Sequence, residues 1–430
     1  MMNTATAEYL NQALLLSNMD KFEEALSYVE KAEAADPMDI DVYFRKGELY
    51  VMLDMLDEAQ NAFEKALLID KQSGEAYFHL GNVTVLKDDF QGSKNFYAKA
   101  IANGFDAAQV YVNLCNVSEH FNDYRAALDY ADKALKADKY RGDVYLKKIE
   151  LLRLLGRVED ITATCDKLIE TNPDVFEGYH IKFLTLVELG KIEAAEETLK
   201  TAMILFPDDP GFMLDKVRLL MKKNDSAGAL KEIDKAIDDM EEVPVEFYIE
   251  KSEVLLSMAK PDEASSLLEV VVESEYNQEA YYLLLNIYIA QEKFDKALEV
   301  SEKIISSEED TAVYYSALYY RGLSLKKLDR NEQAQKALEE ANEKLRFACT
   351  LNPMMLDLYI FRALALFDLN RYEECLEMTD YVLSVADEFS AAHLIKAQVY
   401  EALGNKDKAA EETRLAGEQS ELVSQILEAQ

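Results

Sequence analysis

The stretch YFRKGE, residues Tyr43–Glu48, returns as YFHLGN at Tyr77–Asn82 and as YVNLCN at Tyr111–Asn116, each time after 34 residues. In each copy the tyrosine is followed four positions later by a small residue, which is Gly47, Gly81 or Cys115. A fixed period of this length is typical of a repeated supersecondary unit that buries its apolar face only against its neighbours. The 430-residue chain is therefore organised first by its repeats and only then by domains.

The tyrosine marks the fourth position of a unit that recurs along the chain, at Tyr9, Tyr43, Tyr77, Tyr111, Tyr145, Tyr179, Tyr248, Tyr281 and Tyr359. Sixteen residues after this fourth position the side chain is small in every unit but one, where it is Ile161. The small residues at this position are Ala25, Ala59, Ser93, Ala127, Ala195, Ala229, Ala264, Ala297, Ala334, Cys375 and Ala409. Seven residues further, a second small position is filled by Ala32, Ala66, Ala100, Ala134, Ala202, Ala236, Ala341 and Ala416. We interpret the tyrosine as a knob for which the small residues, both the one four positions later and these two, leave room.

Apolar residues within each unit recur at three- and four-residue spacing over two segments of about a dozen residues. Polar turns such as Asn18–Asp20 and Lys87–Asp89 separate the two segments. Prolines such as Pro37, Pro173 and Pro207 close several units, because a proline ends one helix and prepares the next connection. The pattern predicts a helix, a turn and a second helix in every unit.

The composition favours a folded, helical and strongly acidic chain. Hydrophobic residues make up 49% and charged residues 30%, with only 14 glycines and 7 prolines to interrupt helices. The formal net charge of −36 would repel nucleic-acid phosphates and anionic lipid heads, so we expect neither partner. The acidity either keeps an apolar-rich surface soluble or selects partners with basic segments, and the sequence leaves both explanations open.

Cysteine usage and the first residues bear on the compartment. Cys115, Cys165, Cys349 and Cys375 form no CxxC pair and fall where the repeats need small or apolar residues, so we expect buried, reduced thiols. The chain starts without a basic n-region, its longest early apolar run is Ala13–Leu16, and no stretch approaches the roughly 20 apolar residues of a membrane span. We therefore expect a cytoplasmic protein without membrane insertion.

The unit resembles the tetratricopeptide repeat, which has an aromatic residue at position four, small residues at positions eight, twenty and twenty-seven, and a closing proline. Residues 40–73 show this pattern with Tyr43, Gly47, Ala59 and Ala66, and the resemblance covers nearly the whole chain. It implies an all-α fold, an α-solenoid or right-handed superhelix of about twelve helix-turn-helix repeats.

The repeat rhythm suggests three segments. Residues 1–309 carry repeats 1 to 9, and residues 310–416 carry repeats 10 to 12 after the irregular acidic run at 306–315. The second helix of repeat 10 is lengthened, from about Asn331 to Leu351. Residues 417–430 are predicted to form a C-terminal helix that covers the last repeat with Leu422, Ile426 and Leu427, because a solenoid end needs a cap.

The resemblance also implies a binding surface, because in this family the first helices line a concave groove through the second, fifth, sixth, ninth and twelfth positions of each unit. Here it implies a peptide-binding groove that contains Phe44, Arg45, Glu48, Phe78, His79, Asn82, Val112, Asn113, Asn116, Leu146 and Lys147. The fifth positions are nearly all apolar along the chain, which serves either helix packing or peptide docking.

Some members of the family bind a C-terminal carboxylate with lysine and asparagine side chains from three successive units. This sequence has Asn82, Asn113 and Lys147 in that phase, but Phe78 and Asp143 replace the two further lysines. The loss of two ammonium groups removes much of the charge complementarity, so an extended apolar or mixed peptide fits better.

No phosphate-binding loop, GxSxG, HExxH or paired CxxC motif occurs, and the four histidines, His79, His120, His180 and His393, are isolated. The sequence therefore predicts no catalytic, cofactor-binding or metal-binding residues. We expect a non-enzymatic scaffold that binds a protein or peptide along the concave groove, with basic segments among the candidate partners. The alternative is a structural subunit that self-associates through exposed helix faces, and the oligomeric state is open.

Overall fold

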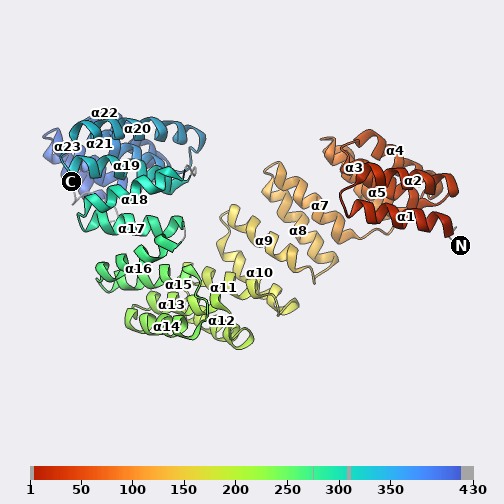
Figure 1. Cartoon of the computed structure of the whole chain (residues 1–430), viewed down its shortest axis with the longest axis horizontal. Helices are drawn as coiled ribbons and strands as arrows, with labels where there is room; N and C mark the ends of the chain where they lie inside the picture. Colours follow the sequence, from red (N-terminus) through yellow and green to blue (C-terminus); the bar gives the residue numbers. More distant parts are fainter. Residues whose placement is uncertain (1–3, 275, 308–310, 418–430) are drawn as a thin grey trace. The chain divides into compact units, whose positions relative to one another are not determined.

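The structure is a computed structural model that describes residues 4–274, 276–307 and 311–417. This part of the chain contains twenty-four α-helices and no strand, and successive helices pack as antiparallel pairs (Figure 1). The predicted all-α fold built from helical hairpins is confirmed.

The first helices of the hairpins are α1 (Thr4–Ser17), α3 (Ile40–Met52), α5 (Gly74–Leu86), α7 (Ala107–His120), α9 (Gly142–Leu154), α11 (Phe176–Glu188), α13 (Pro210–Lys222), α15 (Val245–Ser257), α17 (Gln278–Ala290), α19 (Ala312–Lys327), α21 (Leu356–Asp368) and α23 (Ser390–Ala402). The second helices are α2 (Phe22–Ala35), α4 (Leu56–Ile69), α6 (Phe90–Ala102), α8 (Tyr124–Ala137), α10 (Val158–Thr171), α12 (Ile192–Leu205), α14 (Ser226–Asp239), α16 (Pro261–Ser274), α18 (Phe294–Ser306), α20 (Asn331–Leu351), α22 (Tyr372–Val385) and α24 (Lys406–Leu415). The lengthened α20 has the predicted ends.

The chain divides into two compact units, Met1–Asp215 and Lys216–Gln430, and the division falls inside α13. The boundary that we expected near residue 310 stays a prediction, because residues 308–310 lie outside the described part. The expected C-terminal capping helix also falls on residues, 418–430, that the structure does not describe.

Every hairpin turns through one residue in the left-handed conformation, and these residues are Asp20, Asp54, Asp88, Asn122, Gly156, Gly190, Asn224, Ala259, Glu292, Asp329, Asn370 and Gly404. The next amide bonds back to the end of the first helix, as when the N–H of Met55 donates to the carbonyl of Tyr50 at 2.8 Å. Glycine, asparagine and aspartate tolerate this conformation, which explains the polar turns in the sequence. Ala259 and Glu292 adopt the same left-handed conformation, although alanine and glutamate do not tolerate it in this way.

The repeated tyrosines are buried or half-buried, as the sequence predicts. The hydroxyls of Tyr43, Tyr77, Tyr281 and Tyr359 tie their first helices to the end of the preceding unit. The hydroxyl of Tyr43 donates to the carbonyl of Pro37 at 3.0 Å, and that of Tyr359 donates to the carbonyl of Cys349 at 3.0 Å. Each tyrosine of this kind therefore satisfies its polar atom while it buries its ring.

The small residue at position eight makes room for a different ring than the sequence suggested. A Cβ on Gly47 would lie 2.5 Å from the ring of Phe63 in α4, and one on Gly81 would lie 2.5 Å from the ring of Tyr97 in α6. The interpretation that this notch receives the repeated tyrosine is wrong at these positions. The ring that fills it comes from the second helix of the same hairpin.

The alanine seam of the second helices is buried as expected, with Ala25, Ala59, Ala127 and Ala195 at 0% exposure. Ile161 occupies the same position at 0% exposure, so the larger side chain is accommodated in the core.

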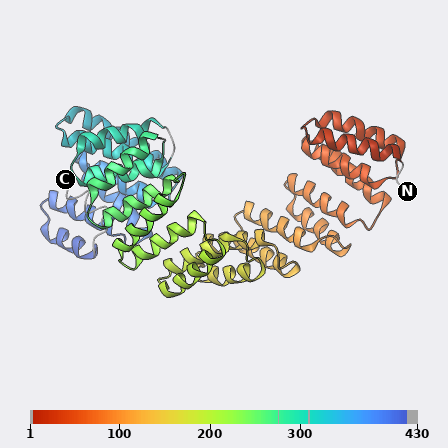
Figure 2. The same ribbon diagram turned by 60° about the horizontal axis from the view of Figure 1, so that its bottom comes forward.

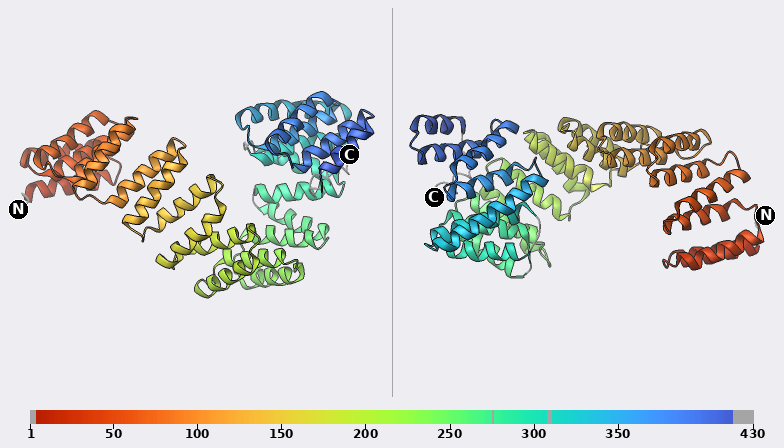
Figure 3. Two further views of the ribbon diagram at one scale, coloured as in Figure 1. Left: turned by 180° about the vertical axis from the view of Figure 1, so that it is seen from behind. Right: turned by 90° about the horizontal axis from the view of Figure 1, so that it is seen from above.

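The two units differ in how their cores are connected. In the first unit, separate clusters of buried side chains each span two or three neighbouring helical hairpins. In the second unit, one continuous cluster runs from Ile249 to Ala416. First helices contact one another there, because Tyr319 and Tyr320 of α19 pack against Phe361 of α21 with ring centroids 6.2 and 5.9 Å apart. The helices from α17 to α23 accordingly gather closely in the green-to-blue part of Figures 2 and 3.

Candidate functional site

Two neighbouring cavities lie along α1, α3 and α5, the first helices of the first three hairpins. The larger, of about 390 Å³, is lined by Ser17, Asp20, Phe22, Arg45, Glu48, Leu49, Val51, Met52, Phe63, His79, Asn82, Val83 and Leu86. The smaller, of about 300 Å³, is lined by Ala7, Leu10, Asn11, Leu14, Asp41, Phe44, Arg45, Glu48 and Glu75. We call the two cavities together the N-terminal groove.

The two cavities adjoin on α3, because Arg45 and Glu48 line both of them. These residues lie one turn apart on α3, and the guanidinium Nη1 is 2.8 Å from a carboxylate oxygen of Glu48. Both side chains remain partly exposed, at 32% and 41%. A partly solvated pair of this kind contributes less than about 1 kcal/mol to stability, so either partner can rearrange toward a ligand at small cost.

The mouth of the smaller cavity is acidic. Asp41, Glu48 and Glu75 surround it with three carboxylates, against the single guanidinium of Arg45. Burial raises the pKa of Glu75 above its usual value, and the negative charges of Asp41 and Glu48 raise it further. The local potential is therefore negative, and a cation placed here would relieve the repulsion among the carboxylates.

His79 forms an uncharged wall of the larger cavity. Its ring stacks on Phe63, with centroids 4.8 Å apart and an interplanar angle of 10°, and it also lies against Phe44. Burial lowers the pKa of His79 to about 4, so the imidazole is neutral near pH 7. It can therefore act there as an aromatic surface or a neutral hydrogen-bonding group, and not as a cation.

The structure brings only part of the predicted site together. Phe44, Arg45, Glu48, His79 and Asn82 line the N-terminal groove, although Phe44 is only 9% exposed. The cavities are not lined by the other predicted residues, which are Phe78, Val112, Asn113, Asn116, Leu146 and Lys147.

The asparagine and lysine positions of the carboxylate-binding pattern are engaged within the protein. The side-chain oxygen of Asn82 accepts hydrogen bonds from Asn113 and from the hydroxyl of Tyr97, both at 2.8 Å. The ammonium of Lys147 lies 3.1 Å from Glu119 and 2.8 Å from Glu150. These contacts add to the two missing lysines as a reason against carboxylate capture by this set of residues.

Sequence reasoning missed most of the α1 wall and the acidic mouth. The residues missed there are Ala7, Asn11, Leu14, Asp41 and Glu75, whereas Leu10 was already expected to face the groove as a fifth position. All five occupy second, sixth or ninth positions of their units, which are ligand-facing phases in the resemblance.

The apolar fifth positions serve packing in the second unit. Tyr319, Ile360 and Leu394 are 0%, 5% and 7% exposed, so no open apolar strip runs along these first helices. The four cysteines are free and buried, as predicted, and burial raises the pKa of their thiols to about 11 or 12.

Within the described ranges, no group of three or more His, Cys, Asp or Glu side chains is arranged to hold a metal ion. Across the same residues, none of the helices combines the length and the apolar character that a membrane crossing requires.

The fold and its helical hairpins define a repeat solenoid, and comparison with known families names the repeat. Tetratricopeptide repeat models match residues 19–81, 182–244, 278–311 and 316–344. The chain is a tetratricopeptide repeat protein. Proteins of this family are typically non-catalytic, and the fold supports a general role as a protein–protein interaction scaffold.

Similar proteins match only parts of the chain. It is 28% identical over 213 residues to the BBSome complex member BBS4 homolog of Drosophila melanogaster, a match that covers 48% of this chain and 40% of that protein. It is 22% identical over 203 residues to the TPR repeat-containing protein YpiA of Bacillus subtilis, covering 46% of each. The chain thus spans less than half the length of these relatives.

Among solved structures, a tetratricopeptide repeat protein from Parabacteroides merdae aligns with 59% of this chain and 99% of its own, at 19% identity and a TM-score of 0.45.

Proposed function

We propose that the N-terminal groove binds an extended segment of a partner protein that carries basic side chains. The observation that carries this proposal is the pair of adjoining cavities between α1, α3 and α5, which share Arg45 and Glu48. Their volumes fall at the lower end of the roughly 300–1,000 Å³ that ligand sites occupy, and together they offer room for several consecutive side chains.

The lining suits a peptide that is apolar on one side and cationic on the other. Met52 and Leu86 supply apolar surface in the larger cavity, where they are 60% and 52% exposed. A flexible methionine adapts to different side chains, which favours recognition of a peptide class over a single shape. Asp41 and Glu75 at the mouth of the smaller cavity then offer oxygen acceptors to lysine or arginine.

The first unit is favoured over the second because its groove is open. In the second unit Tyr319 and Tyr320 are fully buried where first helices meet, so packing against neighbouring helices covers this part of α19. A non-enzymatic role fits this surface. A cytoplasmic location stays a prediction, supported by four free and buried thiols.

A substitution that blocks the smaller cavity, and a matched substitution at the neighbouring residue, provide the test. A random dodecapeptide library displayed on phage should be selected on the full chain, and recovered peptides should be measured by fluorescence anisotropy. Leu14→Trp fills the smaller cavity, which Leu14 lines at 39% exposure, whereas Leu15→Trp adds the same bulk beside it on a residue that is 56% exposed and outside the lining.

Recovered peptides enriched in lysine or arginine should lose at least tenfold in affinity on Leu14→Trp and keep it on Leu15→Trp. Equal binding to both variants, with matching thermal melts, would place the peptide elsewhere. Light scattering on the same samples tests the alternative of self-association, because a lasting dimer that Leu14→Trp dissociates would make the groove a self-association surface.

A further inference from the structure

A third cavity, of about 650 Å³, lies in the second unit and has no part in the function proposed above. It forms where the end of α18, the start of α19 and the C-terminal half of α20 meet, and its lining is Ile305, Tyr314, Tyr315, Glu343, Lys344, Arg346 and Phe347. We call it the α20 pocket. Its lining side chains lie outside the row of first-helix positions that forms a tetratricopeptide groove.

The lengthened α20 builds this pocket. The helix has 21 residues, whereas the other second helices have 10 to 14. Leu345, Ala348 and Cys349 hold the inner side of the added turns, at 2% exposure or less. On the outer side Phe347 and Leu351 are 65% and 58% exposed, which leaves large apolar side chains in water. Unpartnered apolar side chains beside a cavity mark an interaction surface.

The charge of the pocket is opposite to that of the chain. Lys344 and Arg346 face one lining carboxylate, Glu343, in a protein with 82 acidic and 46 basic residues. Among the described residues, no carboxylate forms an ion pair with Lys344 or Arg346. A basic spot in an acidic field concentrates acidic partners locally while the whole chain still repels polyanions such as nucleic acids.

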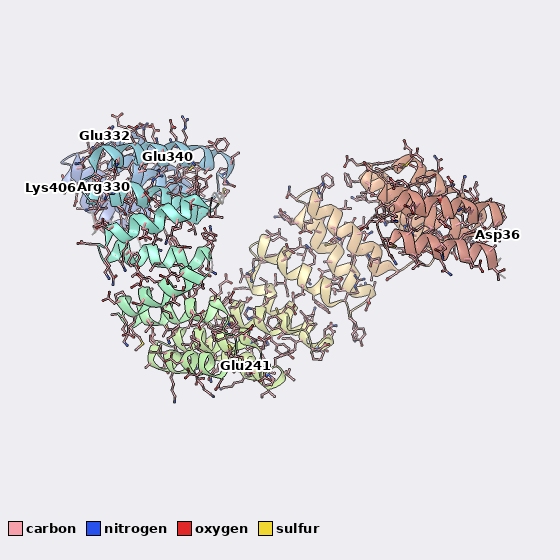
Figure 4. The ribbon with its side chains drawn as sticks, in the orientation of Figure 1. Asp36, Glu241, Arg330, Glu332, Glu340 and Lys406 are labelled. Carbon is pink, nitrogen blue, oxygen red and sulfur yellow. The ribbon has the colours of Figure 1, made fainter. Side chains whose placement is uncertain are left out.

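The ammonium of Lys344 is held but not neutralised. It donates a hydrogen bond to the hydroxyl of Tyr314 and lies 5.2 Å from the centroid of that ring. The nearby Glu340, labelled in Figure 4, is bonded instead by Arg321 at 2.7 Å. An ammonium has three N–H donors, so Lys344 can bind a carboxylate while it keeps its bond to the tyrosine.

We propose that the α20 pocket docks a partner peptide that carries an acidic side chain next to an apolar one. The carboxylate would bind between Lys344 and Arg346, and the apolar side chain would pack on Phe347 and the paired rings of Tyr314 and Tyr315, whose centroids are 5.3 Å apart. A partner with both features is the chemical complement of this lining. The site is independent of the N-terminal groove and prefers ligands of opposite charge.

The test selects random dodecapeptides on the full chain and then measures each recovered peptide on two charge-reversal variants. Arg346→Glu reverses a lining cation, whereas Lys336→Glu reverses an exposed lysine of the same helix that pairs with Glu332 at 3.0 Å and is not among the lining residues. Thermal melts by circular dichroism should first show that both variants keep the wild-type fold.

Peptides with aspartate or glutamate beside leucine, isoleucine or phenylalanine should lose about tenfold or more in affinity on Arg346→Glu and little on Lys336→Glu, because a charge-assisted hydrogen bond is lost only in the first. Phe347→Ser should weaken the same peptides, while Leu14→Trp leaves them unaffected, which keeps this site distinct from the N-terminal groove.

Four results would overturn the proposal. Selection could recover no acidic and apolar sequences, or recover sequences that bind Arg346→Glu as well as wild type. Inorganic phosphate at millimolar concentration could displace the peptide completely, which would indicate simple anion attraction. Light scattering could show a dimer that Phe347→Ser dissociates, which would assign the face to a second copy of this chain.

Discussion

Replacing Gly47 by alanine tests the contact that holds the third and fourth helices together. The added Cβ would lie 2.5, 2.5 and 2.8 Å from three ring carbons of Phe63, whereas ordinary contact begins near 3.4 Å. Alanine gains about 1 kcal/mol of helix propensity over glycine. Overpacking of a tight core costs about 1–3 kcal/mol, and Phe63 is only 1% exposed, so its ring cannot move into solvent. The close approach to three ring carbons places the cost toward the upper end of that range, and after the gain in propensity we expect a net loss of up to about 2 kcal/mol.

Hydrogen exchange followed by mass spectrometry is the appropriate assay, because repeat arrays open locally and one global free energy of unfolding is not well defined. Amides of Ile40–Met52 and Leu56–Ile69 should exchange faster in Gly47→Ala, by up to about 30 times, the factor that corresponds to about 2 kcal/mol. The double variant Gly47→Ala, Phe63→Leu should recover much of the protection. Gly142→Ala is the control, because a Cβ there meets its nearest atoms at 3.7 Å. Unchanged or slower exchange in Gly47→Ala would refute the packing argument.

Three further predictions concern stability. Ala259→Gly should raise the melting temperature of the second unit, because Ala259 has φ of 55° and the left-handed conformation costs about 1–2 kcal/mol in a residue with a Cβ; an unchanged melt would contradict this. Ile161→Ala should lower the opening free energy of its own hairpin, measured by hydrogen exchange, by about 2–5 kcal/mol although it restores the repeat's usual small residue, because the Ile161 side chain is fully buried; a neutral effect would contradict this. The folded pKa of His79 is about 4, below the unfolded value of 6.5, so the unfolded chain binds the proton more readily between these values and stability falls as the pH drops through that window. The loss should reach roughly 2 kcal/mol at pH 4.5, and the urea midpoint of His79→Phe should lack that part of the pH dependence.

The fold was predictable because its determinants are local and repeated. A period of 34 residues, small residues at fixed phases and polar turns each constrain the same helical hairpin. The turn residues Asp20, Asp54 and Asp88 adopt the left-handed conformation that their side chains tolerate.

The partner of each notch was not predictable, because the sequence does not show which ring crosses from one helix to the next. Gly47 and Tyr43 lie one turn apart on α3, and that spacing suggested a shared role. The structure instead pairs Gly47 with Phe63 of α4, while the hydroxyl of Tyr43 binds the carbonyl of Pro37. Such pairings depend on the angle between helices, which sequence periodicity leaves undetermined.

The candidate site was predictable in its phase and less so in its extent. Arg45, Glu48 and His79 were identified, but nothing in the sequence distinguishes the open first unit from the filled second one. Phe44 and Tyr319 occupy the same repeat position, and their surroundings depend on how closely the first helices approach one another. The acidic mouth at Glu75 was hidden because acidic residues are common throughout the chain.

The most direct test of the N-terminal groove is hydrogen exchange of the full chain with and without a basic peptide selected on it. We predict slower exchange in the segments Thr4–Ser17, Ile40–Met52 and Gly74–Leu86, which carry most of the lining of the two cavities, and no such protection in Leu14→Trp. Protection confined to other helices, or retained in Leu14→Trp, would contradict the account.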